Sequence, residues 1–170
     1  MERARLAVNE EYLPVLVNNL STARKTVLLT TYKIQRSTRP NARKLMAIHK
    51  ALLKAAARGV DVRILTNLQA GPNLGAHINL ISARNLIYGG CQVQGLDRPR
   101  IIHAKTCIID SERVILGSHN ITNKAISSNY EVSIFFIDQY FARILEERFY
   151  KLWSISSTSP DHINRRPGPS

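Results

Sequence analysis

The stretch IIHAKTCIIDSERVILGS, residues 101–118, decides the fold. It contains two short runs rich in isoleucine and valine, 101–110 and 113–118, with Asp110-Ser111-Glu112 at the junction. β-Branched residues favour strands, and Asp and Ser favour turns. Because only neighbouring antiparallel strands are joined by so short a link, the stretch predicts an antiparallel pair.

The hydrophobic spacing on either side of this pair alternates between the period of a helix and that of a strand. Helices are predicted over 10–24, 42–58, 75–88 and 139–152, a short helix near Ile121, and further strands over 26–32, 60–66, 91–94 and 131–137. The last helix is predicted to bury Phe141, Leu145, Phe149 and Leu152. This order predicts an α/β fold, in which a mixed β-sheet is sandwiched between helices in a single domain, residues 1–153. The polar, proline-containing residues 154–170 are predicted to form a disordered C-terminal tail.

Composition narrows the class of protein. No run of about 18 apolar residues is present, so the sequence predicts no stable membrane insertion. Its start, MERARLAVNEEYLP, lacks the apolar segment of a secretory signal, and a cytoplasmic location is expected. Cys91 and Cys107 are too few for a disulfide framework or a zinc site and are predicted to be inert core thiols.

The net charge of +12 predicts a positive field around the molecule. Such a field attracts nucleic acid or an anionic membrane surface, although basic residues also serve solubility alone. Basic residues that could grip a phosphate backbone, or simply be solvated, are Lys33, Arg36, Arg39, Arg43, Lys44, Arg98 and Arg100.

The chemistry is concentrated in and just after the deciding stretch. His103 and Lys105 are two residues apart, so on a strand they project from the same face. An ammonium neutralises phosphate oxygens, while an imidazole attacks phosphorus or moves a proton. Lys105 inside an apolar strand also favours a bound anion, because an unpaired buried ammonium is costly. Ser118 and Asn120 follow the next strand and offer hydrogen bonds to the same oxygens.

These residues form the pattern His103-x-Lys105-x4-Asp110, followed by Gly117-Ser118-x-Asn120, Thr122 and Asn129-Tyr130-Glu131. The pattern resembles the HKD signature of the phospholipase D superfamily, and its single short copy resembles that family's small bacterial endonucleases. The resemblance extends over about residues 26–150. It implies that the catalytic residues are His103, Lys105, Asp110 and Glu131, and that Lys105, Ser118 and Asn120 bind the substrate phosphate. It implies no metal and no cofactor.

Several of these residues also have simpler interpretations. Asp110 could serve only to open the turn, and Ser118 or Asn120 could cap the helix near Ile121. Glu131 could merely begin a strand, whereas the resemblance implies that it hydrogen-bonds the histidine. His119 could line the rim of the site.

Family members set two copies of the motif against each other, and this chain has one. The resemblance therefore implies a homodimer with one shared site. The predicted function is a metal-independent endonuclease that cleaves DNA or RNA through a phosphohistidine, with little sequence preference. A phospholipase D-type lipid hydrolase is an alternative, disfavoured because no apolar mouth is visible in the sequence. A catalytically silent nucleic-acid-binding module is another.

Overall fold

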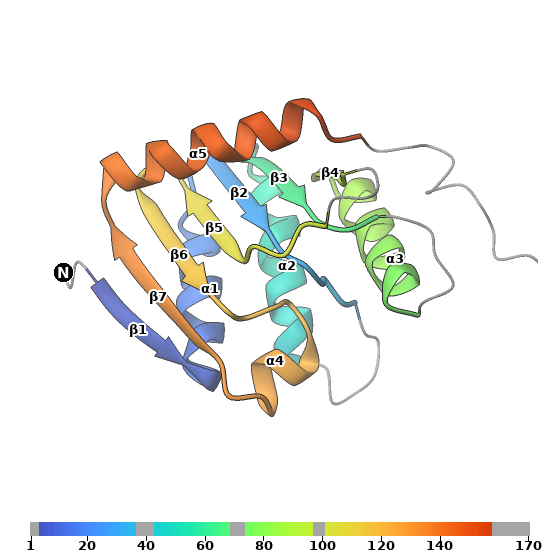
Figure 1. Ribbon diagram of the computed structural model, residues 1–170, viewed down its shortest axis with the longest axis horizontal. Helices are drawn as coiled ribbons and strands as arrows, with labels where there is room; N and C mark the ends of the chain where they lie inside the picture. The colour runs from blue at the N-terminus through green and yellow to red at the C-terminus, as the bar shows by residue number, and fades with distance from the viewer. Residues whose placement is uncertain (1–3, 37–42, 69–73, 97–100, 158–170) are drawn as a thin grey trace, which may run out of the picture.

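The structure is a computed structural model that describes residues 4–36, 43–68, 74–96 and 101–157, with the backbone alone for residues 74–77. A mixed sheet lies at its centre, with strand order β1-β7-β6-β5-β2-β3-β4 (Figure 1). Its strands are β1 Ala4–Val8, β2 Thr26–Thr30, β3 Asp61–Leu65, β4 Gln92–Gln94, β5 Thr106–Ile109, β6 Arg113–Gly117 and β7 Val132–Ile137. β2, β3 and β4 run parallel, while the pairings of β2–β5, β5–β6, β6–β7 and β1–β7 are antiparallel.

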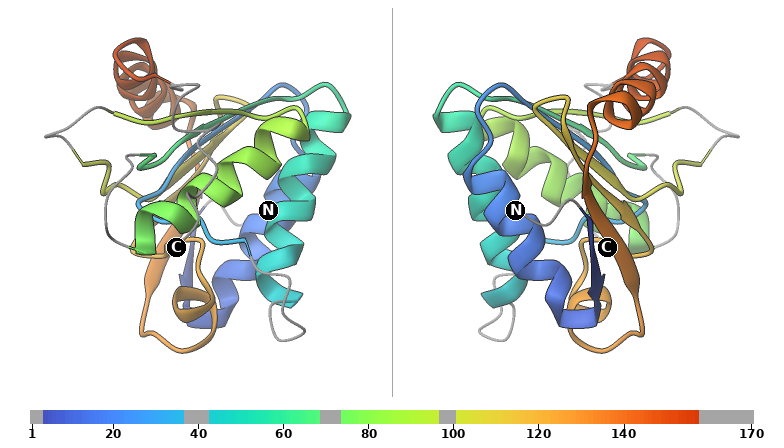
Figure 2. Two further views of the ribbon diagram at one scale, coloured as in Figure 1. Left: turned by 90° about the vertical axis from the view of Figure 1, so that its right-hand side faces the viewer. Right: turned by 90° about the vertical axis from the view of Figure 1, so that its left-hand side faces the viewer.

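Helices cover both faces of the sheet. They are the 3-10 helix η1 Asn9–Glu11, α1 Tyr12–Ser21, α2 Arg43–Ala57, α3 Leu74–Tyr88, α4 Asn123–Ser127 and α5 Gln139–Ser154. α1, α2 and α3 lie on one side and α5 on the other (Figure 2). The prediction of a mixed sheet sandwiched between helices is confirmed.

The alternation of side chains along the central strands separates two cores. On β2 and β5, Val27 and Cys107 belong to the core beneath α1 and α2, whereas Leu28 and Ile108 belong to the core beneath α5. Both thiols are buried, and burial raises the pKa of Cys91 to about 11 and that of Cys107 to about 12. At neutral pH they therefore stay protonated, as expected of core thiols.

One strand was not predicted, and two predictions about the elements were wrong. β1 was not predicted, because five residues with no clear alternation carry little signal and are held by pairing with β7. Of the strand expected over 101–110, only Thr106–Ile109 pairs as a strand. The tail was expected to be disordered from residue 154, yet Ser157 pairs with Gly95 through two backbone hydrogen bonds of 3.0 and 3.1 Å. The rest of that tail, 158–170, lies outside the described residues.

The buried face of α5 also differs from the expected one. Phe149 is buried as predicted, and Leu145 and Leu152 pack partly against the same core, but Phe141 is 53% exposed. Ala142, one residue on, takes the inward position because it lies two helical turns before Phe149.

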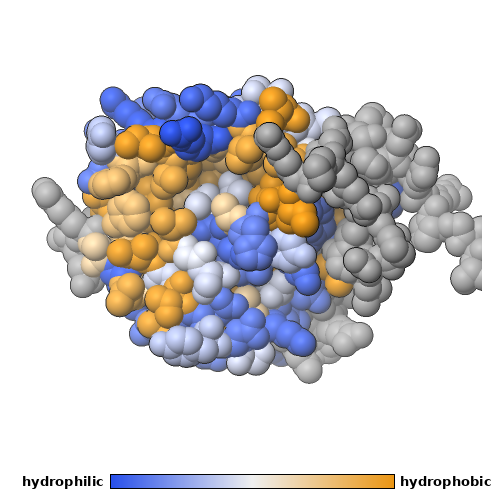
Figure 3. All heavy atoms as spheres, viewed as in Figure 1, coloured by the Kyte–Doolittle hydropathy of each residue, from blue (hydrophilic) through white to orange (hydrophobic). Residues whose placement is uncertain are grey.

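α5 covers only one end of its face of the sheet. Beyond it, apolar side chains gather on the surface over β1, β7 and β6 (Figures 1 and 3). Leu6, Ile134 and Leu116 are direct cross-strand neighbours there, and all three are exposed. With Val132, also exposed, they form what we call the open apolar row.

Candidate active site

The motif residues that matter for chemistry meet at one edge of the sheet. His103 and Lys105 lie just before β5, Ser118 and Asn120 just after β6, and Glu131 just before β7 (Figure 1). Because β5, β6 and β7 are antiparallel neighbours, the start of one lies beside the end of the next. The fold thus brings together five of the six side chains that the sequence predicted.

His103 and Lys105 are in direct contact. Lys105 Nζ lies 3.1 Å from His103 Nδ1 and donates to the carbonyl oxygen of His103 at 2.5 Å. The two residues are not on a strand, as was expected, but on the irregular segment that leads into β5. The imidazole is exposed to solvent there, while Lys105 is half-buried. An accessible nucleophile beside a cation is what a phosphate site requires.

The environment of Lys105 works on its charge in two directions. Partial burial lowers the pKa of its ammonium group, and the negative charge of Glu131 opposes this decrease. Glu131 is therefore close enough to act electrostatically on Lys105.

Tyr32 completes the immediate surroundings of His103, and sequence reasoning missed it. Its ring lies 5.0 Å from the imidazole ring, and the Nζ atoms of Lys33 and Lys105 lie 5.4 and 5.8 Å from the centre of the phenol ring. Tyr32 follows β2, which pairs with β5, so its place beside His103 depends on that long-range pairing. No local pattern in the sequence signals it.

Ser118 and Glu131 form a second contact at this edge. The Ser118 hydroxyl donates to one oxygen of the Glu131 carboxylate, and Asn129 donates to the other at 2.9 Å. Within one chain the carboxylate makes no hydrogen bond to His103, so the contact that the family resemblance implies is not formed inside a single chain. Glu131 is buried, and its backbone is held by Asn9.

Asn120 ties this edge to the segment that carries Tyr32. Its Oδ1 accepts from the backbone amide of Lys33 at 3.1 Å. Neither Ser118 nor Asn120 caps the following helix, because that role belongs to Thr122, whose hydroxyl accepts from the amide of Ala125 at 3.2 Å. Gly117 is required by close approach to β7, where a Cβ would overlap Ser133 and the carbonyl oxygen of Val132.

Asp110 lies at the opposite edge of the sheet. It follows β5, and five residues of extended chain from Lys105 span about 16 Å. Its carboxylate accepts from the amides of Arg24, Lys25 and Thr26 and pairs with Arg113 at 2.6 Å. Burial raises its pKa, but these donors outweigh burial and the pKa falls below its ordinary value. The structure therefore places Asp110 in the turn, as the simpler interpretation held, and not beside His103.

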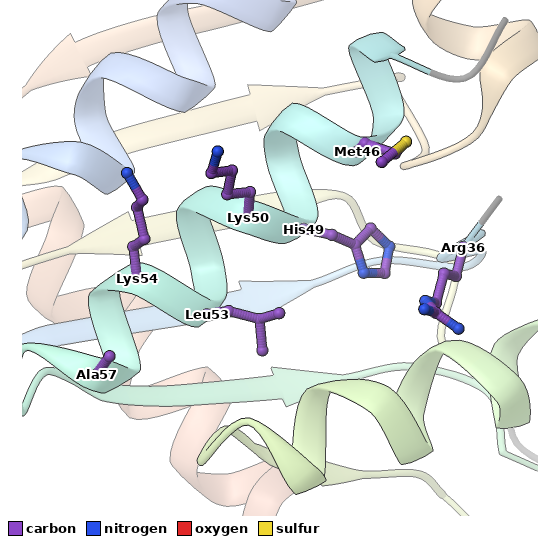
Figure 4. Close-up of a pocket in the computed structure, with 7 residues that line it drawn as sticks. All are labelled: Arg36, Met46, His49, Lys50, Leu53, Lys54 and Ala57. Carbon is purple, nitrogen blue, oxygen red and sulfur yellow. The ribbon is translucent and has the colours of Figure 1, made fainter. Parts of the chain in front are cut away.

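Two other histidines are buried away from the pair. His119, for which a place at the rim of the site was left open, is 1% exposed: its ring stacks on Tyr12, and its nitrogens contact Ser133 Oγ and the carbonyl of Asn9. His49 lines a separate cavity of about 450 Å³ along α2 (Figure 4). Its Nε2 lies 3.0 Å from the carbonyl oxygen of Gln35, which explains the residue structurally.

A hollow of about 370 Å³ opens directly beside His103. Its walls are formed by Thr30, Leu96, Ile101, Ile102, His103, Ala104 and Leu152. Most of these side chains are apolar, so the site has an apolar mouth that was not visible in the sequence. The hollow could not be foreseen, because Leu96 and Leu152 reach it only through the packing of α5 on the sheet.

The remaining predictions concern basic residues, metal binding and membrane-spanning helices. Lys33, Arg36 and Arg43 are exposed, and Lys44 is paired with Glu10 at 2.6 Å. Arg39, Arg98 and Arg100 lie outside the described residues. Among the residues described, no three His, Cys, Asp or Glu side chains are grouped to hold a metal ion. In the same part of the chain no helix is both long and apolar enough to span a membrane.

Comparison with known proteins bears on the family and the fold. Residues 16–153 match the family described as "Cardiolipin synthase, PLD-like domain". Cardiolipin synthase A of Pseudomonas fluorescens is 31% identical over 100 residues, which are 59% of this chain and 21% of that protein. The chain thus spans about a fifth of the length of the curated relative that it matches.

Two solved structures share the fold along almost their entire length. Nuc from Salmonella typhimurium, described as a phospholipase D family member, is 22% identical with a TM-score of 0.72, over 91% of this chain and 97% of that one. NucT from Helicobacter pylori is 21% identical with a TM-score of 0.70, over 90% and 98%.

Proposed function

Because the chain belongs to the phospholipase D superfamily, we propose that it is a metal-independent endonuclease that cleaves DNA or RNA through a phosphohistidine. The observation that carries this proposal is the exposed imidazole of His103, with the Lys105 ammonium 3.1 Å from its Nδ1. The imidazole is the nucleophile, and the ammonium neutralises the phosphate oxygens that it meets.

Displacement at phosphorus needs a nucleophile on one side and an acid on the other. Among the side chains that the structure describes, one exposed imidazole, that of His103, lies at this edge, since His119 is buried. A second copy of the chain supplies the other imidazole across a two-fold axis. The catalytic unit is therefore a homodimer with one shared site.

The open apolar row supports this dimer. Leu6, Ile134 and Leu116 lie side by side across three strands, and the next neighbour in that line is Thr106, which adjoins Lys105. A contiguous exposed apolar surface favours burial against a partner. Because the row ends beside the catalytic pair, pairing two such rows brings the two pairs near each other.

The reaction has two steps. The neutral His103 of one chain attacks phosphorus, so a P–N bond forms while the bond to the leaving oxygen breaks and the partner's His103 gives that oxygen a proton. Water then attacks phosphorus and gives a proton to the partner's His103, and the P–N bond breaks. Because one copy of His103 must be neutral and the other protonated, the rate should depend on pH with a bell-shaped profile.

The remaining polar groups stabilise charge on the phosphate. The Lys105 ammonium exchanges its contacts with His103 for the non-bridging oxygens. Asn120 Nδ2, which has no partner within the described residues, donates to the same oxygens, and Ser118 lies beside it. Glu131 holds Ser118 and sustains the charge on Lys105.

The positive balance of the chain favours nucleic acid as the substrate. Exposed Lys33 adjoins Tyr32 at the site and suits a phosphate backbone. Arg36, also exposed, lines the separate cavity along α2. Phosphate contacts carry little sequence information, so cleavage shows weak sequence preference. A cytoplasmic location stays a prediction.

The test is cleavage of plasmid and single-stranded oligonucleotide in excess EDTA by the wild type and by His103→Ala. Cleavage by the wild type alone supports the proposal. Binding without cleavage by either protein would support a silent binding module, and loss of wild-type activity in EDTA would contradict metal independence.

A lipid phosphodiester is the second candidate, and one observation favours it. The hollow beside His103 is largely apolar and suits an acyl or glyceryl group attached to the phosphate. The similarity to a cardiolipin synthase points the same way.

Ile101 lines the hollow and is exposed, so its mutation can distinguish a lipid substrate from nucleic acid. For a lipid enzyme, Ile101→Asp should reduce release of headgroup from phosphatidylglycerol or phosphatidylcholine vesicles at least tenfold, with unchanged hydrolysis of a small soluble phosphodiester. For a nuclease, neither vesicle is hydrolysed by wild type or variant.

A further inference from the structure

Two asparagines lie behind the catalytic pair, and neither belongs to the motif. Asn67 follows β3, and Asn79 is on α3, where only 2% of it is exposed. A buried amide must satisfy its donors and acceptor within the protein. The partners of these two side chains show what they hold in place.

Asn67 binds the peptide groups immediately before His103. Its Oδ1 accepts from the amide of Ile102 at 2.9 Å, and its Nδ2 donates to the carbonyl oxygen of Ile102 at 2.8 Å. The same Nδ2 donates to the carbonyl oxygen of Tyr32 at 3.1 Å. The Asn67 side chain thus supplies the hydrogen bonds that a neighbouring strand would otherwise make to Ile102.

Asn79 holds the other wall of the site and also Asn67 itself. Its Nδ2 donates to the carbonyl oxygens of Tyr32 at 3.1 Å and of Asn67 at 2.9 Å. Its Oδ1 accepts from the amide of Ile34 at 3.0 Å. Tyr32, fixed from both sides, packs its ring against the imidazole of His103.

The segment that carries His103 needs such support. Residues 101–105 are outside any strand, and within the described residues their backbone bonds to other backbone groups are limited to Lys105, whose carbonyl accepts from Gly117. An exposed side chain on an unpaired segment samples many orientations, and a displacement of about 1 Å costs about 100-fold in rate.

We propose that Asn67 and Asn79 are positioning residues that hold His103 for attack on phosphorus. Asn67 fixes the backbone before the histidine, and Asn79 fixes Asn67 together with the Tyr32 segment. This inference rests on the proposed function, because it assigns the held imidazole as the nucleophile.

Asn67→Ala tests it, with Asn19→Ala as the matched control. Asn19 is half-buried and also makes two side-chain hydrogen bonds, to Val15 and Arg113, but lies at the opposite edge of the sheet. Asn67→Ala should lower kcat about 100-fold with KM within threefold of the wild type, while Asn19→Ala keeps kcat within threefold. Thermal midpoints, measured for both, show whether stability losses are comparable.

A second readout does not depend on catalysis. In wild-type protein labelled at Tyr and His, NMR should show cross-peaks between the rings of Tyr32 and His103, and also between Tyr12 and His119, whose centres are 4.2 Å apart. Asn67→Ala should lose the first cross-peak and keep the second.

The outcomes separate the two proposals. Loss of the cross-peak in an enzyme with reduced kcat supports positioning. If Asn67→Ala loses the cross-peak but the wild type cleaves no phosphodiester, the positioning of His103 is supported and the proposed function is overturned. Retention of the cross-peak, or a kcat equal to that of Asn19→Ala, overturns the positioning role.

Discussion

At the residue scale, the proposed site requires that Lys105 stay positively charged. Lys105 needs its proton to neutralise a phosphate oxygen, yet partial burial lowers its pKa. Glu131 opposes that decrease and makes no hydrogen bond to the ammonium, so its contribution is through charge. The carboxylate therefore widens the pH range over which Lys105 stays cationic.

Replacing Glu131 by Gln should narrow that range. The variant removes the negative charge, so the pKa of Lys105 falls further and the rate begins to fall at a lower alkaline pH than in the wild type, with the loss of kcat increasing as pH rises. Steady-state rates from pH 5 to 10 measure it. Asp138→Asn is the control, since Asp138 caps α5 away from the site, and an unshifted limb in Glu131→Gln would contradict the electrostatic role.

The same residues show how far the sequence could predict the site. His103, Lys105, Ser118 and Glu131 could be predicted together because they adjoin three consecutive strands, and antiparallel order brings such neighbours to one edge. Tyr32 could not, because it lies about 70 positions from His103 and reaches it only through the pairing of β2 with β5.

At the scale of elements, the turn between β5 and β6 is joined to the start of β2 by one carboxylate. Asp110 has a positive φ of 55° and accepts from three successive amides, Arg24, Lys25 and Thr26. Those amides precede or begin β2 and would otherwise lack partners. Asp110 therefore joins this turn to the start of β2 and supports the register of the central antiparallel pair.

Asp110→Asn should reduce stability and spare catalysis. The carboxylate has a lowered pKa, so its contribution is full above the ordinary value of 3.8 and is lost as pH falls through the folded-state pKa. Denaturant unfolding at pH 7 should show a loss of about 2 kcal/mol, and the difference from wild type should shrink below pH 3.8. A variant with unchanged stability but abolished kcat at 20 °C would restore Asp110 to the catalytic set.

The elements themselves were predictable where periodicity was strong. α2 and β3 lie within a residue or two of the expected bounds, because each buries a regular stripe of apolar residues. β1 and the shortened β5 were not predictable, since β1 depends on an edge pairing with β7 and β5 begins only after Lys105, at Thr106.

At the scale of the whole molecule, charge and apolar surface are arranged for different partners. The net charge of +12 favours a polyanion. The open apolar row lies on the same face of the sheet as α5, on the part that α5 does not cover, and favours a second copy of the chain (Figure 3). A charge placed in the row should therefore weaken the dimer without touching the catalytic pair.

Ile134→Glu should yield a monomer with activity reduced at least 100-fold. Its side chain lies between Leu6 and Leu116, so a carboxylate there stays exposed in the monomer but would be desolvated in the dimer. Sedimentation and the EDTA-resistant assay measure both effects. Tyr88→Glu is the matched control, because Tyr88 is 87% exposed on α3. A fully active monomer would exclude the shared site.

The shared site also makes a quantitative prediction about mixed dimers. If both imidazoles serve one site, a dimer of one wild-type and one His103→Ala chain is inactive. Co-refolding the two chains at equal concentration leaves about a quarter of the dimers with two intact histidines, so activity should fall to about a quarter of that of pure wild type at the same total concentration. Independent subunits would keep about a half. Because Ser118, Asn120 and Glu131 remain intact in His103→Ala, the difference between these values reports on the number of histidines that each turnover requires.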